Sequence, residues 1–160
     1  MKTPHIYLAA GWFNKEQMRQ MNEVYVVLSG LKAAGKIEFF SPYYNGVVLK
    51  MGDPEFKKKM KEVWELDIAK VVVSDLVVAC TQDNDVGTVF ECGYASAKRI
   101  PILCYNSIPE YGLNLMLAQE ARGFVKDKPS LEKALEGFCL AHEMNRAHNW
   151  RWNEWQGETI

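Results

Sequence analysis

Along the chain, the spacing of hydrophobic residues alternates between the two-residue period of a strand and the 3.6-residue period of a helix. Short apolar runs predict strands at 5–10, 37–40, 76–80, 102–105 and 123–125. Amphipathic stretches predict helices at 15–34, 54–70, 88–98, 114–121 and 131–144. Strands that alternate with helices are joined by right-handed crossovers, so the pattern predicts a three-layer α/β sandwich with a central, mostly parallel five-stranded sheet.

The third of these runs, LVVAC at 76–80, is continuously apolar, as is typical of a strand that a parallel sheet buries on both faces. The 160 residues are 48% hydrophobic and contain no low-complexity tract, which predicts one domain over 1–160 with a C-terminal arm at about 145–160. A net charge of -1 provides no electrostatic attraction to nucleic acid or to an anionic membrane. No apolar run is long enough to span a membrane or to serve as a secretory signal, so we expect a cytoplasmic protein.

The cysteines and histidines do not have the spacing of a metal or redox site. No C-x-x-C pair occurs among the four cysteines, which we interpret as reduced core residues: Cys80, Cys92, Cys104 and Cys139. The three histidines are also scattered along the chain: His5, His142 and His148. Asp83-Asn84-Asp85 resembles the start of a calcium loop, but the following glycine and glutamate are at the wrong positions. We therefore expect no metal site and no mechanism based on histidine.

The segment 85-DVGTVFECGYA-95 contains the most informative chemistry, because Asp85 and Glu91 flank a glycine-bearing turn. One interpretation is structural: Thr88 and Glu91 fit a capping box that opens an ordinary helix. The other is functional. In a parallel sheet the loops after successive strands open on one rim, which would bring Glu91, in the first turn of its helix, close to Asp85 and to Tyr7 of the first strand. A helix N-terminus stabilises a carboxylate as the anion, and an anion suits a nucleophile.

Several motifs, in order along the chain, resemble those of the nucleoside 2-deoxyribosyltransferase family. They are IYLAAGWF at 6–13, Asp67 eight residues before Asp75, DVGxxxExGYA at 85–95, and NLM at 114–116. The resemblance covers residues 5–125 and implies a flavodoxin-like fold. Each motif alone is weak, but the ordered set is specific.

This resemblance implies that Glu91 attacks C1′ of a 2′-deoxynucleoside and holds the sugar as a covalent ester. Tyr7 would orient the Glu91 carboxylate by a hydrogen bond. Asp67 would protonate the departing base and deprotonate the incoming one, and Asp85 would bind a sugar hydroxyl. The implied reaction is retaining glycosyl transfer between a deoxynucleoside and a free nucleobase, which requires no cofactor.

The resemblance also implies a homo-oligomer, built on dimers and extending up to a hexamer, with shared active sites. Asn114 would bind the sugar 5′ end from a neighbouring subunit. Met116 and Phe13 would shape the pocket, while Trp12 and Phe13, which follow Gly11 at a strand end, suit stacking on a base. Three tryptophans near the C-terminus favour burial at an interface: Trp150, Trp152 and Trp155.

Alternatives remain open for these residues. Tyr7 fits a core aromatic, Asp67 an exposed helical acid, and Asn114 a helix cap. For the whole chain, the rivals are a nucleoside N-glycosidase on the same fold and a non-catalytic binding domain. The loop AAGWFN lacks a Ser/Gly-rich phosphate cradle, which disfavours a 5′-phosphate, and Asn45-Gly46 after the second strand leaves the base preference open.

Overall fold

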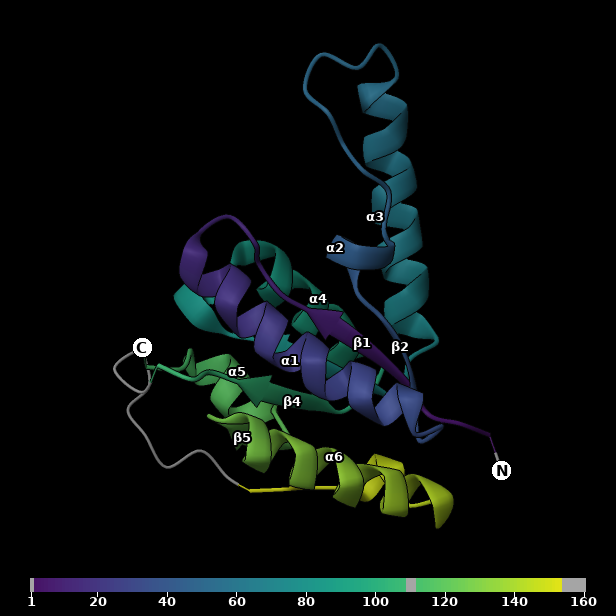
Figure 1. The fold of residues 1–160 in the computed structure, drawn as a ribbon, viewed down its shortest axis with the longest axis vertical. Helices are drawn as coiled ribbons and strands as arrows, with labels where there is room; N and C mark the ends of the chain where they lie inside the picture. Colours follow the sequence, from purple (N-terminus) through teal and green to yellow (C-terminus); the bar gives the residue numbers. More distant parts are fainter. Residues whose placement is uncertain (1, 109–111, 154–160) are drawn as a thin grey trace.

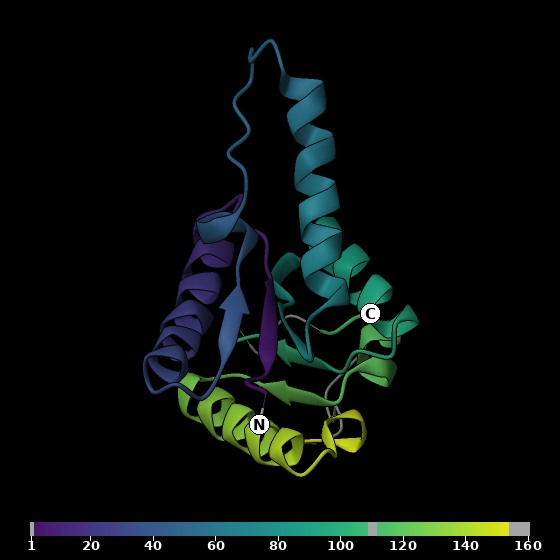
Figure 2. The ribbon, with the colours of Figure 1, turned by 90° about the vertical axis from the view of Figure 1, so that its right-hand side faces the viewer.

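The computed structural model describes residues 2–108 and 112–153 and has a central sheet covered by helices on both faces (Figures 1 and 2). The strands are β1 (His5–Ala9), β2 (Glu38–Phe40), β3 (Leu76–Cys80), β4 (Ile102–Tyr105) and β5 (Gly123–Val125). The α-helices are α1 (Lys15–Ala33), α2 (Pro42–Asn45), α3 (Phe56–Val72), α4 (Val86–Ala97), α5 (Leu115–Glu120) and α6 (Lys128–Glu143). The described residues also include two 3₁₀ turns, η1 (Gln82–Asn84) and η2 (Ala147–Asn149).

All neighbouring strands are parallel, and their order is β2-β1-β3-β4-β5. This is the flavodoxin-like order, so the predicted fold class is confirmed, with a sheet that is parallel throughout. The chain leaves β1 toward β2 on one side and later reaches β3 on the other side. The switch point of the sheet therefore lies between β1 and β3, where ligands bind in such folds.

Alternation along the strands separates the core into two faces. Ile6 and Leu8 of β1 face the core formed with α1 and α6, whereas Tyr7 and Ala9 face the core formed with α4 and α5. Because successive side chains of a strand point to opposite faces, this alternation directs Tyr7 toward α4. The four cysteines are buried and unpaired, as predicted for reduced core residues.

Helix α3 and the preceding segment stand out from the rest of the molecule as an arm (Figures 1 and 2). Its 17 residues contain a single fully buried side chain, Val71, near the C-terminal end, while Met60 and Trp64 are exposed. Because the only buried side chain is near the C-terminal end, only the C-terminal half of α3 lies against the sheet, and Asp67 belongs to that half. The sequence predicted that this helix begins at Pro54, but it begins at Phe56, and α2 was not predicted.

The described part of the predicted C-terminal arm packs on the body of the protein. Trp150 is buried, and its ring packs edge-on against Phe138 with 5.4 Å between centroids. The side-chain amide of Asn153 bonds both the N–H and the carbonyl of Phe124, which covers the edge of β5. Trp150 is thus buried within its own chain, contrary to the expectation that it needs an interface; Trp155 lies outside the described residues. Among the helices described, none combines the length and the apolar character that crossing a membrane requires.

Candidate active site

Tyr7 and Glu91 meet beside the switch point. The Tyr7 hydroxyl, carried by β1, donates a hydrogen bond of 2.5 Å to Oε1 of Glu91 on α4. Tyr7 is fully buried, and its ring stacks on Phe40 of β2 at a centroid distance of 6.0 Å. The packing around Tyr7 therefore fixes the direction from which its hydroxyl approaches Glu91. The other carboxylate oxygen, Oε2, has no bond to Tyr7.

Helix α4 begins earlier than the capping-box interpretation requires. Its first residue is Val86, and the side chain of Asp85 caps it by accepting bonds from the N–H of Thr88 at 2.9 Å and from the Thr88 hydroxyl at 3.0 Å. Thr88 is thus inside the helix, and Glu91 lies in the second turn. The capping box at Thr88 and Glu91 is wrong, as is the placement of Glu91 in the first turn.

Burial dominates the electrostatics of Glu91. It raises the pKa of Glu91 to about 7, while the Tyr7 hydrogen bond favours the anion and the charges of Asp67 and Asp85 disfavour it. The helix dipole acts mainly within the first turn, so it does not hold this carboxylate ionised as predicted. Burial and the neighbouring Glu91 charge raise the pKa of Tyr7 far above its ordinary value, so the hydroxyl stays a donor at physiological pH.

Asp67 reaches the same cluster from α3. It is half-buried, its Oδ1 has no hydrogen-bond partner within the described part of the chain, and burial raises its pKa to about 6. Its charge acts on both Tyr7 and Glu91. Asp67 is therefore not an ordinary exposed acid of a helix face, because a buried, unpartnered carboxyl oxygen is costly to keep without a partner.

Asp85 and Gly11 lie against each other on the rim of the switch point. A Cβ placed on Gly11 would come within 3.1 Å of the Asp85 carboxyl carbon and 2.8 Å of Oε1 of Gln17. Glycine at position 11 thus allows the loop after β1 to approach the start of α4. The close approach keeps the Asp85 carboxylate beside the end of β1, in the neighbourhood of Glu91.

Gln17 was not predicted as part of this site. Its side chain is only 6% exposed, and its Oε1 accepts a 2.9 Å bond from the N–H of Phe13. The signal was present in the sequence: Gln17 lies on the same stripe as Met21, Val24 and Leu28, which are the apolar residues that α1 buries. A polar residue within a buried stripe points to a structural or functional hydrogen bond.

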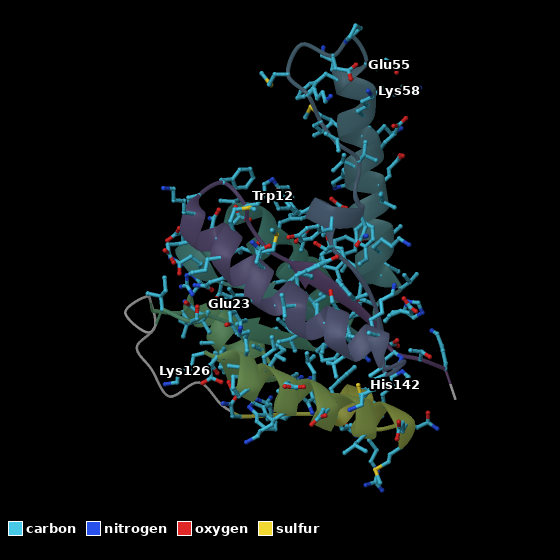
Figure 3. The ribbon with its side chains drawn as sticks, in the orientation of Figure 1. Trp12, Glu23, Glu55, Lys58, Lys126 and His142 are labelled. Atoms are coloured by element: carbon cyan, nitrogen blue, oxygen red, sulfur yellow. The ribbon has the colours of Figure 1, made fainter. Side chains whose placement is uncertain are left out.

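An exposed aromatic wall follows Gly11. Trp12 is 37% and Phe13 is 74% exposed, and their rings stack at a centroid distance of 5.6 Å. Trp12 also contacts Tyr43 of α2 at 5.7 Å. Figure 3 shows Trp12 at the edge of the body of the protein, on the side from which α3 projects. The predicted aromatics therefore remain accessible to a flat ligand instead of filling the core.

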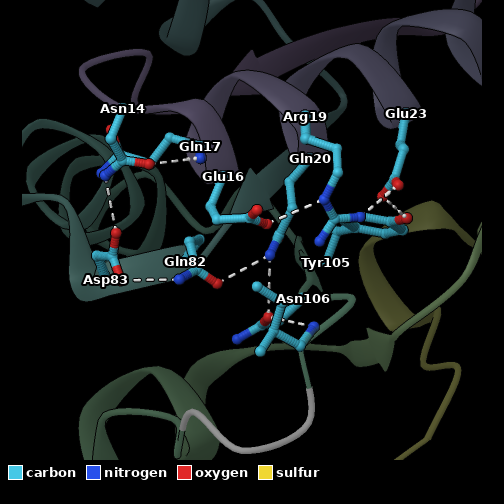
Figure 4. A network of polar contacts seen from close by, with 11 residues as sticks. Asn14, Glu16, Gln17, Arg19, Gln20, Glu23, Gln82, Asp83, Tyr105 and Asn106 are labelled. Carbon is cyan, nitrogen blue, oxygen red and sulfur yellow. Dashed lines mark hydrogen bonds and ion pairs between the residues drawn. The ribbon is translucent and has the colours of Figure 1, made fainter.

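A second set of polar side chains braces the loop that precedes Asp85 (Figure 4). Asp83 and Asn84 both have left-handed φ values, 58° and 48°. Asp83 accepts bonds from Asn14 at 2.9 Å and from Gln82 at 2.7 Å. Buried Gln20 donates to Gln82 at 2.9 Å. These contacts hold the left-handed Asp83 close to the helix cap, and non-glycine residues in this conformation cluster at functional sites.

Asn114 and Met116 are separate from this cluster in the described structure. The Asn114 side chain caps α5 by accepting a 2.9 Å bond from the N–H of Met116, and Met116 is 75% exposed. Within its own chain, Asn114 therefore acts as a helix cap, which was the structural alternative for this residue. Within the described residues, no hydrogen bond joins either side chain to Tyr7 or Glu91. Residues 2–108 and 112–153 also contain no group of three His, Cys, Asp or Glu side chains placed to hold a metal ion.

Comparison with known proteins gives one family match. The family model described as nucleoside 2-deoxyribosyltransferase matches residues 6–140. No curated protein sequence matches the chain.

Solved structures share the fold at low sequence identity. The chain is 24% identical to the 2-deoxyribosyltransferase of Bacillus psychrosaccharolyticus, with a TM-score of 0.65 over 80% of this chain and 90% of that one. A conserved protein of Enterococcus faecalis V583 has 21% identity and a TM-score of 0.64 over 82% and 96%. The CMP N-glycosidase of Clostridium botulinum has 16% identity and a TM-score of 0.52 over 82% and 98%.

Proposed function

Because the chain belongs to the nucleoside 2-deoxyribosyltransferase family, we propose that it moves the 2-deoxyribosyl group of a 2′-deoxynucleoside to another purine or pyrimidine base. The coarse assignment is an enzyme that acts on nucleosides. One observation supports the more specific assignment as a transferase that uses Glu91. A buried tyrosine holds one oxygen of the Glu91 carboxylate, and the half-buried carboxyl group of Asp67 is close enough for its charge to act on both.

In the first half of the proposed reaction, the free Oε2 of Glu91 attacks C1′ of the deoxynucleoside. The bond from C1′ to the base nitrogen breaks, its electron pair goes to the base, and Asp67 supplies the proton that neutralises the departing base. A raised pKa suits Asp67 to this role, because a carboxyl group with an ordinary pKa would hold almost no proton at neutral pH. The product of this step is an ester between C1′ and Glu91.

In the second half, Asp67 removes a proton from the acceptor base, whose nitrogen then attacks C1′ and releases the Glu91 carboxylate. Two displacements at C1′ retain its configuration. The hydroxyl of Tyr7 stabilises the departing carboxylate, since a hydrogen bond to a charged group is stronger than one to a neutral ester oxygen. The missing 2′-hydroxyl helps both halves, because an electron-withdrawing substituent would destabilise the oxocarbenium-like transition state.

The remaining residues divide between the sugar and the base. Asp85 would accept a bond from a sugar hydroxyl, since only one of its oxygens caps α4. The exposed rings of Trp12 and Phe13 would stack on the base, a contact that every base can make. Asn114 and Met116 would act on the site of a neighbouring subunit in a homo-oligomer. The proposal places the enzyme in nucleotide salvage in the cytoplasm.

Hydrolysis is the second candidate, with water in place of the acceptor base. The fold likeness to a CMP N-glycosidase favours it. The loop after β1 disfavours a nucleotide substrate, because Gly11 is followed by two aromatic side chains instead of a phosphate-binding turn.

The test is incubation of the protein with deoxyadenosine and a second free base, followed by chromatography of the products. Transfer predicts the new deoxynucleoside, while hydrolysis predicts free deoxyribose, and Glu91→Gln should abolish either. The matched control is Glu65→Gln on the exposed surface of α3, which should keep full activity. Mass spectrometry of the quenched wild-type reaction should find the sugar on Glu91. An adduct on another residue, or an active Glu91→Gln variant, would contradict the proposal.

A further inference from the structure

At the end of the sheet away from Trp12, where Figure 3 shows His142, the amino ends of β4 and β5 border a cavity of about 350 Å³. Arg99 and Arg122 line it together with His148, over the apolar surface of Ile100 and Pro101. We call this cavity the Arg99–Arg122 groove. Its volume lies within the range of small-molecule sites.

The backbone at Arg99 is in a conformation that suits glycine. Arg99 follows the C-terminal end of α4 with a φ of 60°. Its N–H bonds the carbonyl of Ser96 at 2.8 Å, and the N–H of Ile100 bonds the carbonyl of Ala95 at 3.0 Å, which together form a Schellman motif. Glycine occupies this left-handed position most often, because a side chain there crowds the backbone. An arginine at this position needs another reason to be there.

Neither arginine has an ion-pair partner within the described part of the chain. One carboxylate lines the groove, that of exposed Glu120, and it is not within ion-pair distance of either guanidinium. The groove therefore holds two guanidinium groups against one carboxylate. This excess of positive charge suits an anionic ligand.

Compensation of the helix dipole is the structural alternative, since cations are favoured at a helix C-terminus. Lys98 already provides that charge one residue earlier, at the C-cap of α4, and its ammonium lies 5.7 Å from the centre of the Tyr94 ring. Lys98 does not line the groove. Dipole compensation thus accounts for a basic residue at this end of α4, but not for an arginine at the left-handed position.

We propose that the Arg99–Arg122 groove binds a small phosphate monoester, with the phosphate on the two guanidinium groups and the organic part over Ile100 and Pro101. Guanidinium groups match phosphate oxygens in pairs, which gives both strength and orientation. A second cavity of about 320 Å³ shares Arg99 and His148 with the groove. Asp75 also lines this second cavity, with its Oδ1 3.6 Å from Nε2 of His142, so the second cavity provides room for the organic part and not for the phosphate. The site lies beyond the C-terminal end of α4, whereas Glu91 lies in the second turn of that helix, so the two sites are distinct.

Isothermal titration calorimetry with inorganic phosphate, ribose 5-phosphate and a nucleoside 5′-monophosphate tests this proposal without any nucleoside substrate, so it is independent of the proposed reaction. The wild type should bind a monoester, and Arg99→Gly and Arg122→Gln should each weaken binding by about tenfold, the effect of losing a charge-assisted pair. Arg99→Gly should melt at the wild-type temperature or above it, because glycine suits the backbone there. That result would separate loss of binding from loss of the fold.

The matched control is Lys98→Gln, which removes a neighbouring positive charge outside the groove and should leave affinity unchanged. Equal weakening by Lys98→Gln would overturn the proposal in favour of non-specific attraction by charge. Affinity for inorganic phosphate equal to that for the monoesters would overturn the role of the organic part. Absence of binding at about 10 mM of every probe, or full affinity in both arginine variants, would refute the site itself.

Discussion

Replacing Glu91 by glutamine should stabilise the protein at high pH while removing its activity. Glutamine keeps the shape of the side chain and the oxygen that accepts the Tyr7 hydrogen bond, but it carries no charge. Burial disfavours the charged form of Glu91 in the folded protein, whereas in the unfolded chain the carboxylate is solvated. The stability that the glutamine variant gains over the wild type should therefore appear above the ordinary pKa of the carboxyl group, where the unfolded wild-type chain ionises more readily than the folded one.

The size of this gain follows from the two pKa values. The ordinary value is 4.5, and the folded protein raises it to about 7. Below pH 4.5 the side chain is protonated in both states, so the wild type loses nothing. As pH rises from 4.5 through 7, the unfolded chain releases this proton while the folded state still holds it. The free energy of unfolding therefore falls by about 3 kcal/mol over this range, at about 1.4 kcal/mol for each tenfold change in proton affinity, and then levels off.

Urea denaturation of the wild type and Glu91→Gln at about pH 4.5 and pH 8 measures the effect. We expect equal free energies of unfolding at the lower pH and a variant that is more stable by about 3 kcal/mol at the higher one. Glu132→Gln, on the exposed surface of α6, is the control and should change stability by less than about 0.5 kcal/mol at both. A difference that is the same at both pH values, or a variant less stable at pH 8, would refute the argument that burial controls this carboxylate.

Three further substitutions test the electrostatics and packing of the site through the pH profile of kcat/KM for deoxyadenosine. Tyr7→Phe removes a hydrogen bond that favours the Glu91 anion, so the fall of kcat/KM at low pH, the acid limb of the profile, should move to higher pH by about one to two units. An unchanged fall would show that Tyr7 does not control the ionisation of Glu91. Asp67→Asn removes a charge that raises the pKa of Glu91, so the acid limb should move to lower pH, while the rate falls by about 10²–10⁴-fold through loss of the proton donor. Gly11→Ala places a methyl group 3.1 Å from the Asp85 carboxyl carbon and should lower both kcat/KM and stability, the latter by about 1–3 kcal/mol; wild-type values would show that the loop relaxes freely.

Local patterns in the sequence determined the architecture. The apolar run at 76–80 became the fully buried strand β3, and the alternation around it produced five parallel strands in the predicted class of fold. Parallel strands bring the loops after them to one rim, so the meeting of Tyr7 and Glu91 followed from topology together with the family motifs. The fold class and the meeting of Tyr7 with Glu91 could both be inferred because hydrophobic periodicity and the order of elements are properties of the linear sequence.

The start of α4 depended on contacts that are distant in sequence. Asp85 and Thr88 are both good N-cap residues, so the local sequence offers two starting points for the helix. The structure uses Asp85, because the left-handed turn before it is held by Asn14, from the loop after β1, and by Gln82. Only the folded chain brings Asn14 to Asp83, and with the earlier start Glu91 moved from the first turn into the second.

The charge state of Glu91 and the burial of single side chains were likewise decided by tertiary packing. A helix N-terminus stabilises an anion by about 0.3–1 kcal/mol within the first turn, whereas burial of Glu91 acts in the opposite direction and outweighs it. Gln17 is buried because Gly11 allows the loop after β1 to close over it, and Trp150 is buried because the chain after α6 folds back onto Phe138. Burial is a sum over neighbours from several elements, so a linear pattern determines which face of an element is apolar but not which polar group that face encloses.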